Sequence, residues 1–306
     1  MHVARHRMRV VIDTDPGVDD LVALALAAVS PDFDLAAVTT TYGNASLEAT
    51  TRNAREVLRL AGRSDVPVLP GSAAPLRRTA HTAPVRHGPD GAGDAPVPPA
   101  APVAPVPAVI ADVLAGETGL VTLLTMGPLT NLAAAVERAP DLVRRRLARH
   151  VGMFGNVGID LDRERRADFN TWCDPEAADR ILRASLPTTM VGLDASRHMA
   201  VPDRVVERAR RSGNPLAAWL GAALACALRY DRERRGINGV LVHDALAVGA
   251  LLDPEVLEVR DIPLVVSLDE DVDRGHTREE SRGIPVHVAV SADVGRMLEL
   301  LERVLI

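Results

Sequence analysis

The sequence predicts a single α/β domain over residues 1–306, with a doubly wound, mostly parallel central sheet flanked by helices. Continuous apolar runs, which are typical of buried parallel strands, alternate with helical patterns in the first part of the chain. Apolar residues make up 47% and charged residues 25% of the sequence, as in ordinary globular proteins. A chain of 306 residues buries roughly three quarters of its surface on folding, which is sufficient for one large core.

The N-terminal part has the order strand, helix, strand, helix, strand. The first helix follows the turn at 14–20 and ends before Ser30, and Gly62 closes the second helix at its C′ position. The expected strands are 8–13, 35–44 and 66–69, and the expected helices are 21–29 and 47–61.

Residues 71–107 interrupt this alternation because they are rich in proline, alanine and glycine. A stretch of this length without regular structure is usually functional or a linker. Two interpretations are open here: an inert surface loop, or a mobile flap over an active site that carries His81 or His87.

The alternation resumes in the C-terminal part of the chain. Pro128 and Pro175 each occupy the favoured first position of an expected helix, and Asp174 precedes the second as its N-cap. The expected strands are 119–127, 150–154, 186–194, 257–267 and 285–290. The other expected helices are 128–139, 203–212, 215–235, 243–252 and 292–305.

Composition excludes several classes of function. All 35 basic residues are arginine, so no Schiff-base or P-loop lysine exists, and the net charge of −6 argues against a nucleic-acid binder. The two cysteines, Cys173 and Cys226, fit neither a zinc motif nor a disulfide framework. The sequence shows neither a signal peptide nor a membrane-spanning apolar run. We therefore expect a cytoplasmic enzyme with a small-molecule substrate.

An acidic turn directly follows the first expected strand. Its four carboxylates are Asp13, Asp15, Asp19 and Asp20. Ligands of open α/β sheets bind at this edge, and carboxylates packed so closely repel one another unless a cation or a helix dipole compensates them. Asp19 and Asp20 could simply complement the helix dipole. Oxygen ligands without a cysteine or histidine cluster otherwise indicate Ca²⁺ or Mg²⁺, and Pro16 and Gly17 shape the turn so that Asp15 and Asp20 converge.

Two chemistries fit this turn. Phosphoryl transfer of the haloacid-dehalogenase type uses an Asp-x-Asp pair, but it needs a Thr or Val where Gly17 stands and a distant lysine, which this chain lacks. The second is a metal-dependent N-glycosidase. The turn resembles the signature Asp-x-Asp-Pro-Gly-x-Asp-Asp of the inosine-uridine nucleoside hydrolase family. Further segments resemble this family in the same order: 42–44, 126–131, 169–170 with 174–178, and 242–244 with 253–254.

The resemblance implies one Ca²⁺ at the floor of the pocket, bound to both ribose hydroxyls and a water. Its protein ligands would be the carboxylates of Asp15, Asp20 and Asp244 and the main-chain carbonyl of Met126. Asp15 would also be the general base toward the water, whose attack would invert the anomeric carbon.

The resemblance also assigns residues to the substrate. Asp19, Asn44 and Asn170 would hold the ribose hydroxyls, and His243 would protonate the leaving base. His87 and Tyr230, the latter with its neighbour Arg234, would contact the base. Aromatic residues make up only 2% of the chain, so base stacking would depend on few of them; the candidates, for which core packing is the alternative, are Phe154, Trp172, Trp219 and Tyr230.

Two departures from the family pattern fall on the same end of the sugar. Asp168 stands where relatives usually carry Glu, which shortens the reach to the 3′- or 5′-hydroxyl by one methylene group. The Gly-Asn that binds the 5′-hydroxyl in relatives is replaced by 158–162, where Asp160 or Asp162 is the equivalent. We therefore hypothesise retained glycosidic chemistry with altered recognition of the 5′ end.

The sequence thus predicts a Ca²⁺-dependent ribonucleoside hydrolase of purine or pyrimidine salvage, whose base preference it does not specify. The resemblance implies a homo-oligomer, either a dimer or a tetramer. Two alternatives are open: a hydrolase of a different N-riboside, and a ribose-binding homologue without turnover. The second is disfavoured because binding alone requires neither the base Asp15 nor the acid His243.

Overall fold

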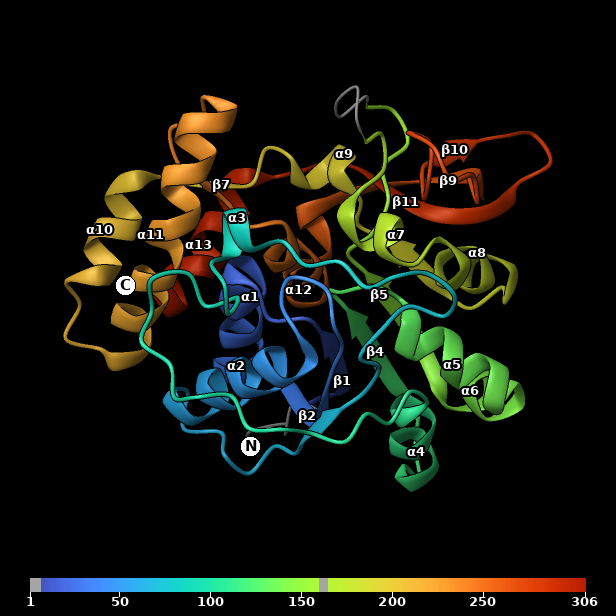
Figure 1. Ribbon diagram of the computed structural model, residues 1–306, viewed down its shortest axis with the longest axis horizontal. Helices are drawn as coiled ribbons and strands as arrows, with labels where there is room; N and C mark the ends of the chain where they lie inside the picture. Colours follow the sequence, from blue (N-terminus) through green and yellow to red (C-terminus); the bar gives the residue numbers. More distant parts are fainter. Residues whose placement is uncertain (1–6, 160–164) are drawn as a thin grey trace, which may run out of the picture.

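The computed structural model describes residues 7–159 and 165–306 and confirms the doubly wound α/β fold (Figure 1). In this part of the chain, a nine-stranded sheet has the order β10-β9-β11-β6-β5-β4-β1-β2-β3. The strands from β3 to β11 along this order pair in parallel, whereas β9 is antiparallel to both of its neighbours. The strand order reverses at β1, where β2 lies on one side and β4 on the other.

The elements of the described residues have the following bounds. The strands are β1 Met8–Thr14, β2 Phe33–Thr40, β3 Val68–Pro70, β4 Val121–Thr125, β5 Leu147–Gly152, β6 Thr188–Met190, β7 Ala200–Val201, β8 Val240–Leu241, β9 Leu257–Val266, β10 Thr277–Glu279 and β11 Ile284–Ala292. The helices are α1 Val18–Val29, α2 Leu47–Leu60, α3 Pro84–His87, α4 Val109–Gly116, α5 Thr130–Arg138, α6 Pro140–Arg146, α7 Phe169–Cys173, α8 Pro175–Arg183, α9 Leu193–Ser196, α10 Asp203–Arg210, α11 Pro215–Arg235, α12 His243–Leu252 and α13 Val294–Leu305; a 3₁₀ turn, η1, covers Pro254–Val256.

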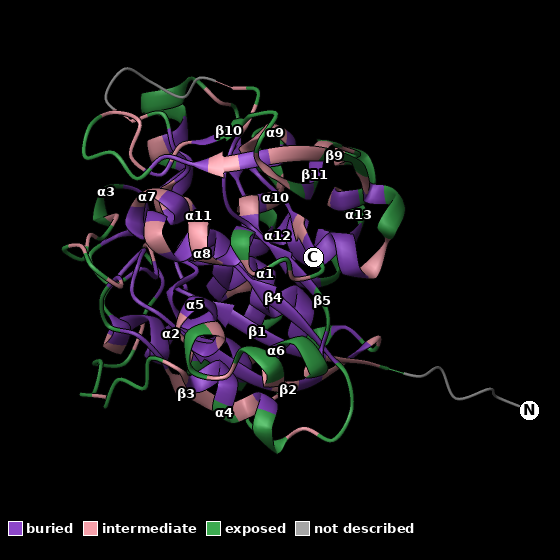
Figure 2. Ribbon diagram, turned by 90° about the vertical axis from the view of Figure 1, so that its right-hand side faces the viewer, coloured by how far each residue is buried: buried purple, intermediate pink, exposed green. Residues whose placement is uncertain are grey.

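The central sheet separates two hydrophobic cores. Successive residues of a strand face opposite sides, so Val10 and Ile12 of β1 enter one core and Val11 enters the other. The first core includes residues of α1, α2 and α10 to α13, and the second includes residues of α4, α5, α6 and α8. Figure 2 shows the resulting arrangement, with buried strands between helices whose outer surfaces are exposed. This two-sided burial explains why the parallel strands are continuous apolar runs.

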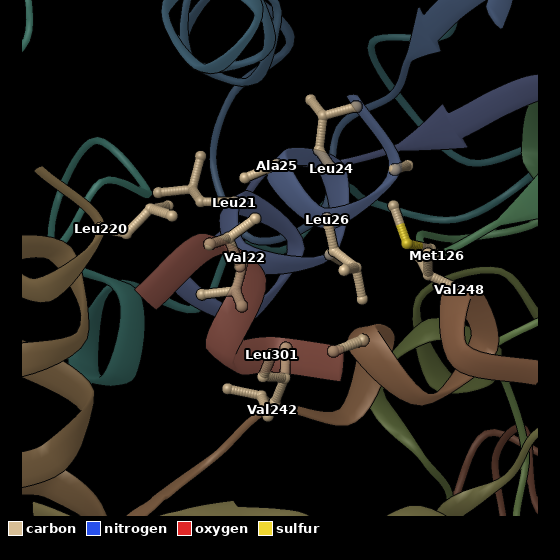
Figure 3. Packing of buried hydrophobic residues seen from close by; sticks show 14 of the residues in the cluster. Leu21, Val22, Leu24, Ala25, Leu26, Met126, Leu220, Val242, Val248 and Leu301 are labelled. Carbon is tan, nitrogen blue, oxygen red and sulfur yellow. The ribbon is translucent and has the colours of Figure 1, made fainter. Parts of the chain in front are cut away.

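Helix α1 is buried along nearly its whole length, from Val18 to Ala28. It packs against α2, α11, α12 and α13, so polar residues are not required on an outer face. Figure 3 shows Leu21, Val22 and Leu26 of α1 among apolar side chains that include Leu220, Val248 and Leu301. The packing fixes the N-terminus of α1, which carries two residues of the acidic turn.

The structure corrects several expected boundaries. Helix α5 begins at Thr130, so Pro128 lies in the preceding turn and not at the first helical position. The segment 71–107 contains the short helix α3, and helices α4 and α6 were absent from the sequence prediction. The N-cap assignment is confirmed, because Asp174 accepts a hydrogen bond from the amide of Ala177 at 3.0 Å. Within the described residues, no helix is both long and apolar enough to cross a membrane.

Candidate active site

A cavity of about 390 Å³ opens at the carboxyl ends of the parallel strands. It lies where the strand order reverses at β1, the usual place for ligand binding in an open α/β sheet. Its lining comes from loops and helix ends that are distant in sequence; it includes Asp19, Asn44, His81, Thr82, Ala83, Val85, Arg86, His87, Met126, Met153, Arg165, Asp168, Phe169, Asn170, Trp172, Leu193, Tyr230, Arg235, His243 and Asp244. Most of the expected site residues are thereby brought to one cavity.

The turn between β1 and α1 holds Asp20 in a fixed orientation. Thr14 donates its hydroxyl to Asp20 Oδ1 at 2.6 Å, and the amide of Gly17 and the Asn44 side chain donate to Oδ2 at 3.1 and 2.9 Å. A Cβ atom on Gly17 would lie 2.4 Å from His87 Nδ1 and 2.6 Å from Asn44 Nδ2. Glycine at this position therefore allows the turn, Asn44 and His87 to pack together.

Asp15 is fully buried next to this turn. Its Oδ2 accepts a hydrogen bond from the amide of Asn44 at 2.7 Å, whereas its Oδ1 has no hydrogen-bond partner among the described residues. Two glycines at neighbouring strand ends leave room for the carboxylate: added Cβ atoms on Gly43 and Gly127 would lie 2.0 Å from Oδ2 and 2.7 Å from Oδ1. The backbone thus forms a cradle around a carboxylate oxygen that needs a partner.

Asp19, Asp20 and Asp244 bring one carboxylate oxygen each to within 4.8 Å of one another. Burial and the neighbouring negative charges raise the pKa of Asp20 to about 7 and the pKa values of Asp15 and Asp244 well above their usual range. A bound divalent cation would remove this repulsion and would give Asp15 Oδ1 a partner. The oxygen-only donor set fits a hard cation.

Asp19 differs from the other carboxylates because it forms a buried ion pair. Arg86 Nη1 lies 3.1 Å from Asp19 Oδ1. Burial opposes ionisation of Asp19 and is the largest single influence, but the Arg86 guanidinium and the smaller contributions of its other neighbours together outweigh it and lower the pKa of this carboxyl. His87 Nδ1 accepts a hydrogen bond from the amide of Val18 at 3.1 Å, and burial together with the Arg86 charge lowers the pKa of His87 to about 3. His87 lines the cavity as a neutral ring that also fixes the N-terminus of α1.

His243, the first residue of α12, lies on a second side of the cavity. Its Nδ1 is 3.0 Å from the hydroxyl of Ser196, and burial lowers its pKa to about 4. Tyr230 of α11 lines the same side, with the Arg235 guanidinium 5.5 Å from the centre of its ring. The sequence pointed to Arg234 as the neighbour of Tyr230, but the structure places Arg235 in the cavity wall. Arg235 is one helical turn after the buried Asp231, with which it pairs at 3.4 Å.

The third side of the cavity is formed by α7. Asp168 is the N-cap of this helix, and its Oδ1 accepts hydrogen bonds from the amides of Thr171 and Gly155, both at 3.0 Å. Asn170 donates its side-chain amide to the carbonyls of Met126 and Met153, both at 2.9 Å. Asp168 and Asn170 both line the cavity, and both are also engaged by the main chain. Asp160 and Asp162 lie outside the described residues.

Aromatic side chains gather on this third side. Trp172 lies 4.6 Å from the His81 ring between centroids, and Phe169 stacks on Trp172 at 6.1 Å. Of the four stacking candidates, Trp172 and Tyr230 line the cavity. Phe154 is packed in the second core, and Trp219 is buried with its ring nitrogen donating to the Pro96 carbonyl at 2.8 Å.

The segment 71–107 contributes cavity residues directly before and within α3, among them His81 and His87. The central part of this segment forms a wall of the cavity. This position agrees better with a segment that covers an active site than with an inert surface loop. Sequence reasoning missed Arg86 and Phe169. The available signal for Arg86 was its position directly before His87 in the otherwise apolar stretch 83–88.

Comparisons with known proteins agree with the fold. The sequence model described as inosine-uridine preferring nucleoside hydrolase matches residues 10–299. A pyrimidine-specific ribonucleoside hydrolase, RihA of Enterobacter sp., is 36% identical over 82% of this chain and 81% of its own length. The solved plant nucleoside hydrolase PpNRh1 superposes with a TM-score of 0.89 at 30% identity, covering 98% of this chain and 99% of its own. The purine-preferring ribonucleoside hydrolase from Gardnerella vaginalis has a TM-score of 0.86 at 27% identity, covering 96% of each chain.

The fold, the acidic cluster and these matches define a metal-dependent hydrolase of N-glycosyl bonds that acts on ribonucleosides. Within that class, the chain belongs to the inosine-uridine preferring nucleoside hydrolase family.

Proposed function

We propose that the chain is a Ca²⁺-dependent ribonucleoside hydrolase in which Asp15, Asp20, Asp244 and the carbonyl of Met126 hold the ion. The observation that supports this proposal best is the buried, unpartnered Asp15 Oδ1 beside carboxylates that crowd to within 4.8 Å. When bound, the ion supplies a positive charge that orients the ribose hydroxyls and lowers the pKa of a bound water. Ca²⁺ suits an oxygen-only site of flexible geometry.

Asp15 acts as the general base in this proposal. Its Oδ1 is available to accept a proton from the attacking water, while the Asn44 amide holds Oδ2 in place. Asp19, Asn44 and Asn170 orient the ribose, and their negative charge and carbonyl dipoles stabilise the oxocarbenium-like transition state. The positions of Asn44 and Asp19 support this role, because both side chains line the cavity at the carboxylate cluster.

His243 assists the leaving base by donating a hydrogen bond to it. The Ser196 hydroxyl lies at Nδ1, so a hydrogen bond donated by Ser196 leaves the proton of the neutral ring on Nε2. The low pKa of His243 is consistent with a neutral imidazole that acts as a directed N–H donor at neutral pH. Tyr230 and His87 complete the base side, with Tyr230 offering a ring face for stacking.

The test is reducing-sugar release from uridine, cytidine, inosine, adenosine and guanosine, with Ca²⁺ and after chelation. Uridine and cytidine come first because the relative from Enterobacter sp. is named as pyrimidine-specific. We expect release that disappears on chelation and in Asp15→Ala, and that returns on adding Ca²⁺ to the chelated wild type. Release that survives chelation would contradict the metal dependence.

A second candidate substrate class has one observation in its favour. Asp168 is shorter than the Glu of relatives and is engaged in capping α7, so recognition at this end of the sugar differs. An N-riboside with an altered 5′ end is therefore the next panel to assay if all five nucleosides are poor substrates. A ribose-binding homologue without turnover would bind Ca²⁺ and ribose and release no sugar from either panel.

Assembly and location stay predictions. The homo-oligomer, dimer or tetramer, is tested by light scattering on the eluted protein, and the cytoplasmic location by fractionation of the source cells.

A further inference from the structure

The guanidinium of Arg86 is buried where the acidic turn, α11 and β8 meet. Nη1 donates to Asp19 Oδ1 at 3.1 Å, and Nη2 donates to the carbonyl of Leu241 at 2.5 Å and to Asp231 Oδ2 at 3.4 Å. The side chains of Arg86, Asp19 and Asp231 are only 9%, 6% and 0% exposed. One cation therefore joins the segment 71–107 to α1, α11 and β8.

Arg86 makes the carboxylates of the site inequivalent. Asp20 accepts its hydrogen bonds from the neutral groups of Thr14, Gly17 and Asn44, whereas Asp19 is paired with a full positive charge. By geometry alone Asp19 is as good a cation ligand as Asp20 and Asp244, since all three offer an oxygen within 4.8 Å of the others. The site thus contains more carboxylates than the proposed ligand set uses.

We propose that Arg86 is a positioning residue that keeps Asp19 from coordinating the metal and leaves it to the ribose. A guanidinium 3.1 Å from Asp19 Oδ1 occupies that oxygen and repels a divalent cation brought close to it. The ion is then coordinated by Asp15, Asp20 and Asp244, and Asp19 remains available at the cavity wall to bind a sugar hydroxyl. This inference rests on the proposed function, because it takes its ligand set from there.

Asp231 explains why Arg86 can hold a fixed position. This carboxylate is completely buried, and its Oδ2 also accepts a hydrogen bond from the amide of Leu241 at 2.9 Å. Loss of Arg86 would leave the buried Asp19 without its guanidinium partner and the buried Asp231 with only Arg235, which is unfavourable. The anchor at Leu241 lies two residues before His243, so the same contact aligns the acidic turn with the base side.

The test uses the double variant Arg86→Met/Asp231→Asn, in which Asp231→Asn removes the buried carboxylate that Arg86→Met alone would deprive of one of its two guanidinium partners. Arg52→Met is the matched control: Arg52 is also buried and donates to the carbonyl of Asp90 in the segment 71–107, but it pairs with Asn53 and not with the acidic cluster. Each chelator-treated protein is titrated with Ca²⁺ by calorimetry. Steady-state kcat/KM is then measured with uridine and 2′-deoxyuridine.

The proposal expects opposite changes in metal and nucleoside binding. In the double variant the Ca²⁺ dissociation constant falls about threefold or more, because Asp19 becomes free to coordinate the ion. At the same time kcat/KM for uridine falls at least tenfold, and the preference for uridine over 2′-deoxyuridine falls at least threefold, because Asp19 no longer faces the sugar. Arg52→Met changes none of these quantities more than twofold.

A merely structural role for Arg86 would weaken Ca²⁺ binding and kcat/KM together, and that result overturns the proposal. So does a kcat/KM for uridine within twofold of wild type. If the wild type binds Ca²⁺ and releases no sugar from any nucleoside, the proposed function fails. The inference about Arg86 is then tested by calorimetry alone. Tighter Ca²⁺ binding in the double variant supports the inference, and unchanged or weaker binding overturns it.

Discussion

The amide of Asn44 donates a hydrogen bond to Asp15 Oδ2 at 2.7 Å and leaves the buried Oδ1 of the same carboxylate without a partner among the described residues. Asp15 directly follows β1, and Asn44 lies in the loop after the neighbouring parallel strand β2, so both residues lie at the same edge of the sheet. An orphaned carboxylate oxygen costs free energy unless something binds it. The free protein is therefore less stable than the same fold with this oxygen satisfied.

The first prediction concerns Asp15→Asn. The substitution removes one of the crowded negative charges and keeps an acceptor for the Asn44 amide, so the chelated variant is more stable than chelated wild type. A gain of about 1 kcal/mol corresponds to roughly 2–4 °C in Tm for a large domain. The same variant binds Ca²⁺ at least tenfold more weakly, and sugar release falls by a factor of about 10² to 10⁴. Thermal unfolding in chelator, calorimetry and the sugar assay check the three effects; a lower Tm in chelator would contradict the repulsion.

The second prediction uses the glycine cradle around Asp15. A Cβ on Gly127 would lie 2.7 Å from Asp15 Oδ1 and 3.0 Å from Thr41 Cγ2, so Gly127→Ala must displace the carboxylate. We expect Ca²⁺ affinity to fall at least tenfold. Gly116→Ala is the control, because a Cβ there meets nothing within 4 Å. Equal Ca²⁺ affinities in the two variants would mean that Asp15 is not a ligand.

The convergence of the acidic turn and Met126 at one edge of the sheet could be predicted from the sequence, whereas the partner of Asp19 could not. Asp15 and Met126 directly follow the buried parallel strands β1 and β4, and Asp20 lies in the first turn of the helix after β1; parallel strands end at a common edge, so local sequence suffices to bring them together. Arg86 stands in a Pro- and Ala-rich segment without periodicity, and its partners lie 67, 145 and 155 residues away. Only the tertiary fold defines such a contact.

Two details of the fold that the sequence prediction did not specify correctly have physical causes. An apolar run that predicts a strand does not indicate whether that strand pairs in parallel or antiparallel with its neighbours. The antiparallel edge formed by β9, β10 and β11 therefore could not be predicted from the alternation of strands and helices. Pro128 fits the first position of a helix, but the amide of Met126 bonds to the Asp13 carbonyl at 2.8 Å and continues the strand-edge pairing. The helix consequently starts later, at Thr130.

The third prediction tests recognition at the 5′ end of the sugar. Asp168→Glu adds the methylene group that relatives have, and we expect the ratio of kcat/KM for uridine to that for 5′-deoxyuridine to rise at least threefold. Helix capping alone could also change when Asp becomes Glu. The control is Asp293→Glu, because Asp293 caps α13 through the amide of Arg296 at 3.0 Å, outside the cavity lining. An unchanged ratio in Asp168→Glu would refute altered 5′-end recognition.

The last prediction concerns His150, which is fully buried in β5 and lies outside the cavity lining. Its Nε2 and Nδ1 lie 2.9 Å and 3.0 Å from the hydroxyls of Thr125 and Thr188, which join it to the strands on both sides. Burial lowers the pKa of His150 from 6.5 to about 3 in the folded protein. The unfolded chain therefore binds a proton between these two pH values and the folded chain does not.

Because the folded pKa of His150 is depressed, its neutral form stabilises the fold fully above pH 6.5, and this contribution is lost as the pH falls toward 3. From pH 6.5 to pH 5 the wild type loses about 2 kcal/mol of unfolding free energy through this group. His150→Gln removes the titration, so the free-energy difference between wild type and variant shrinks by that amount over the same range. Urea unfolding of the chelated proteins at both pH values measures it, and the exposed His198→Gln shows how much any lost histidine contributes. Parallel pH profiles for wild type and His150→Gln would mean that His150 keeps an ordinary pKa in the folded chain.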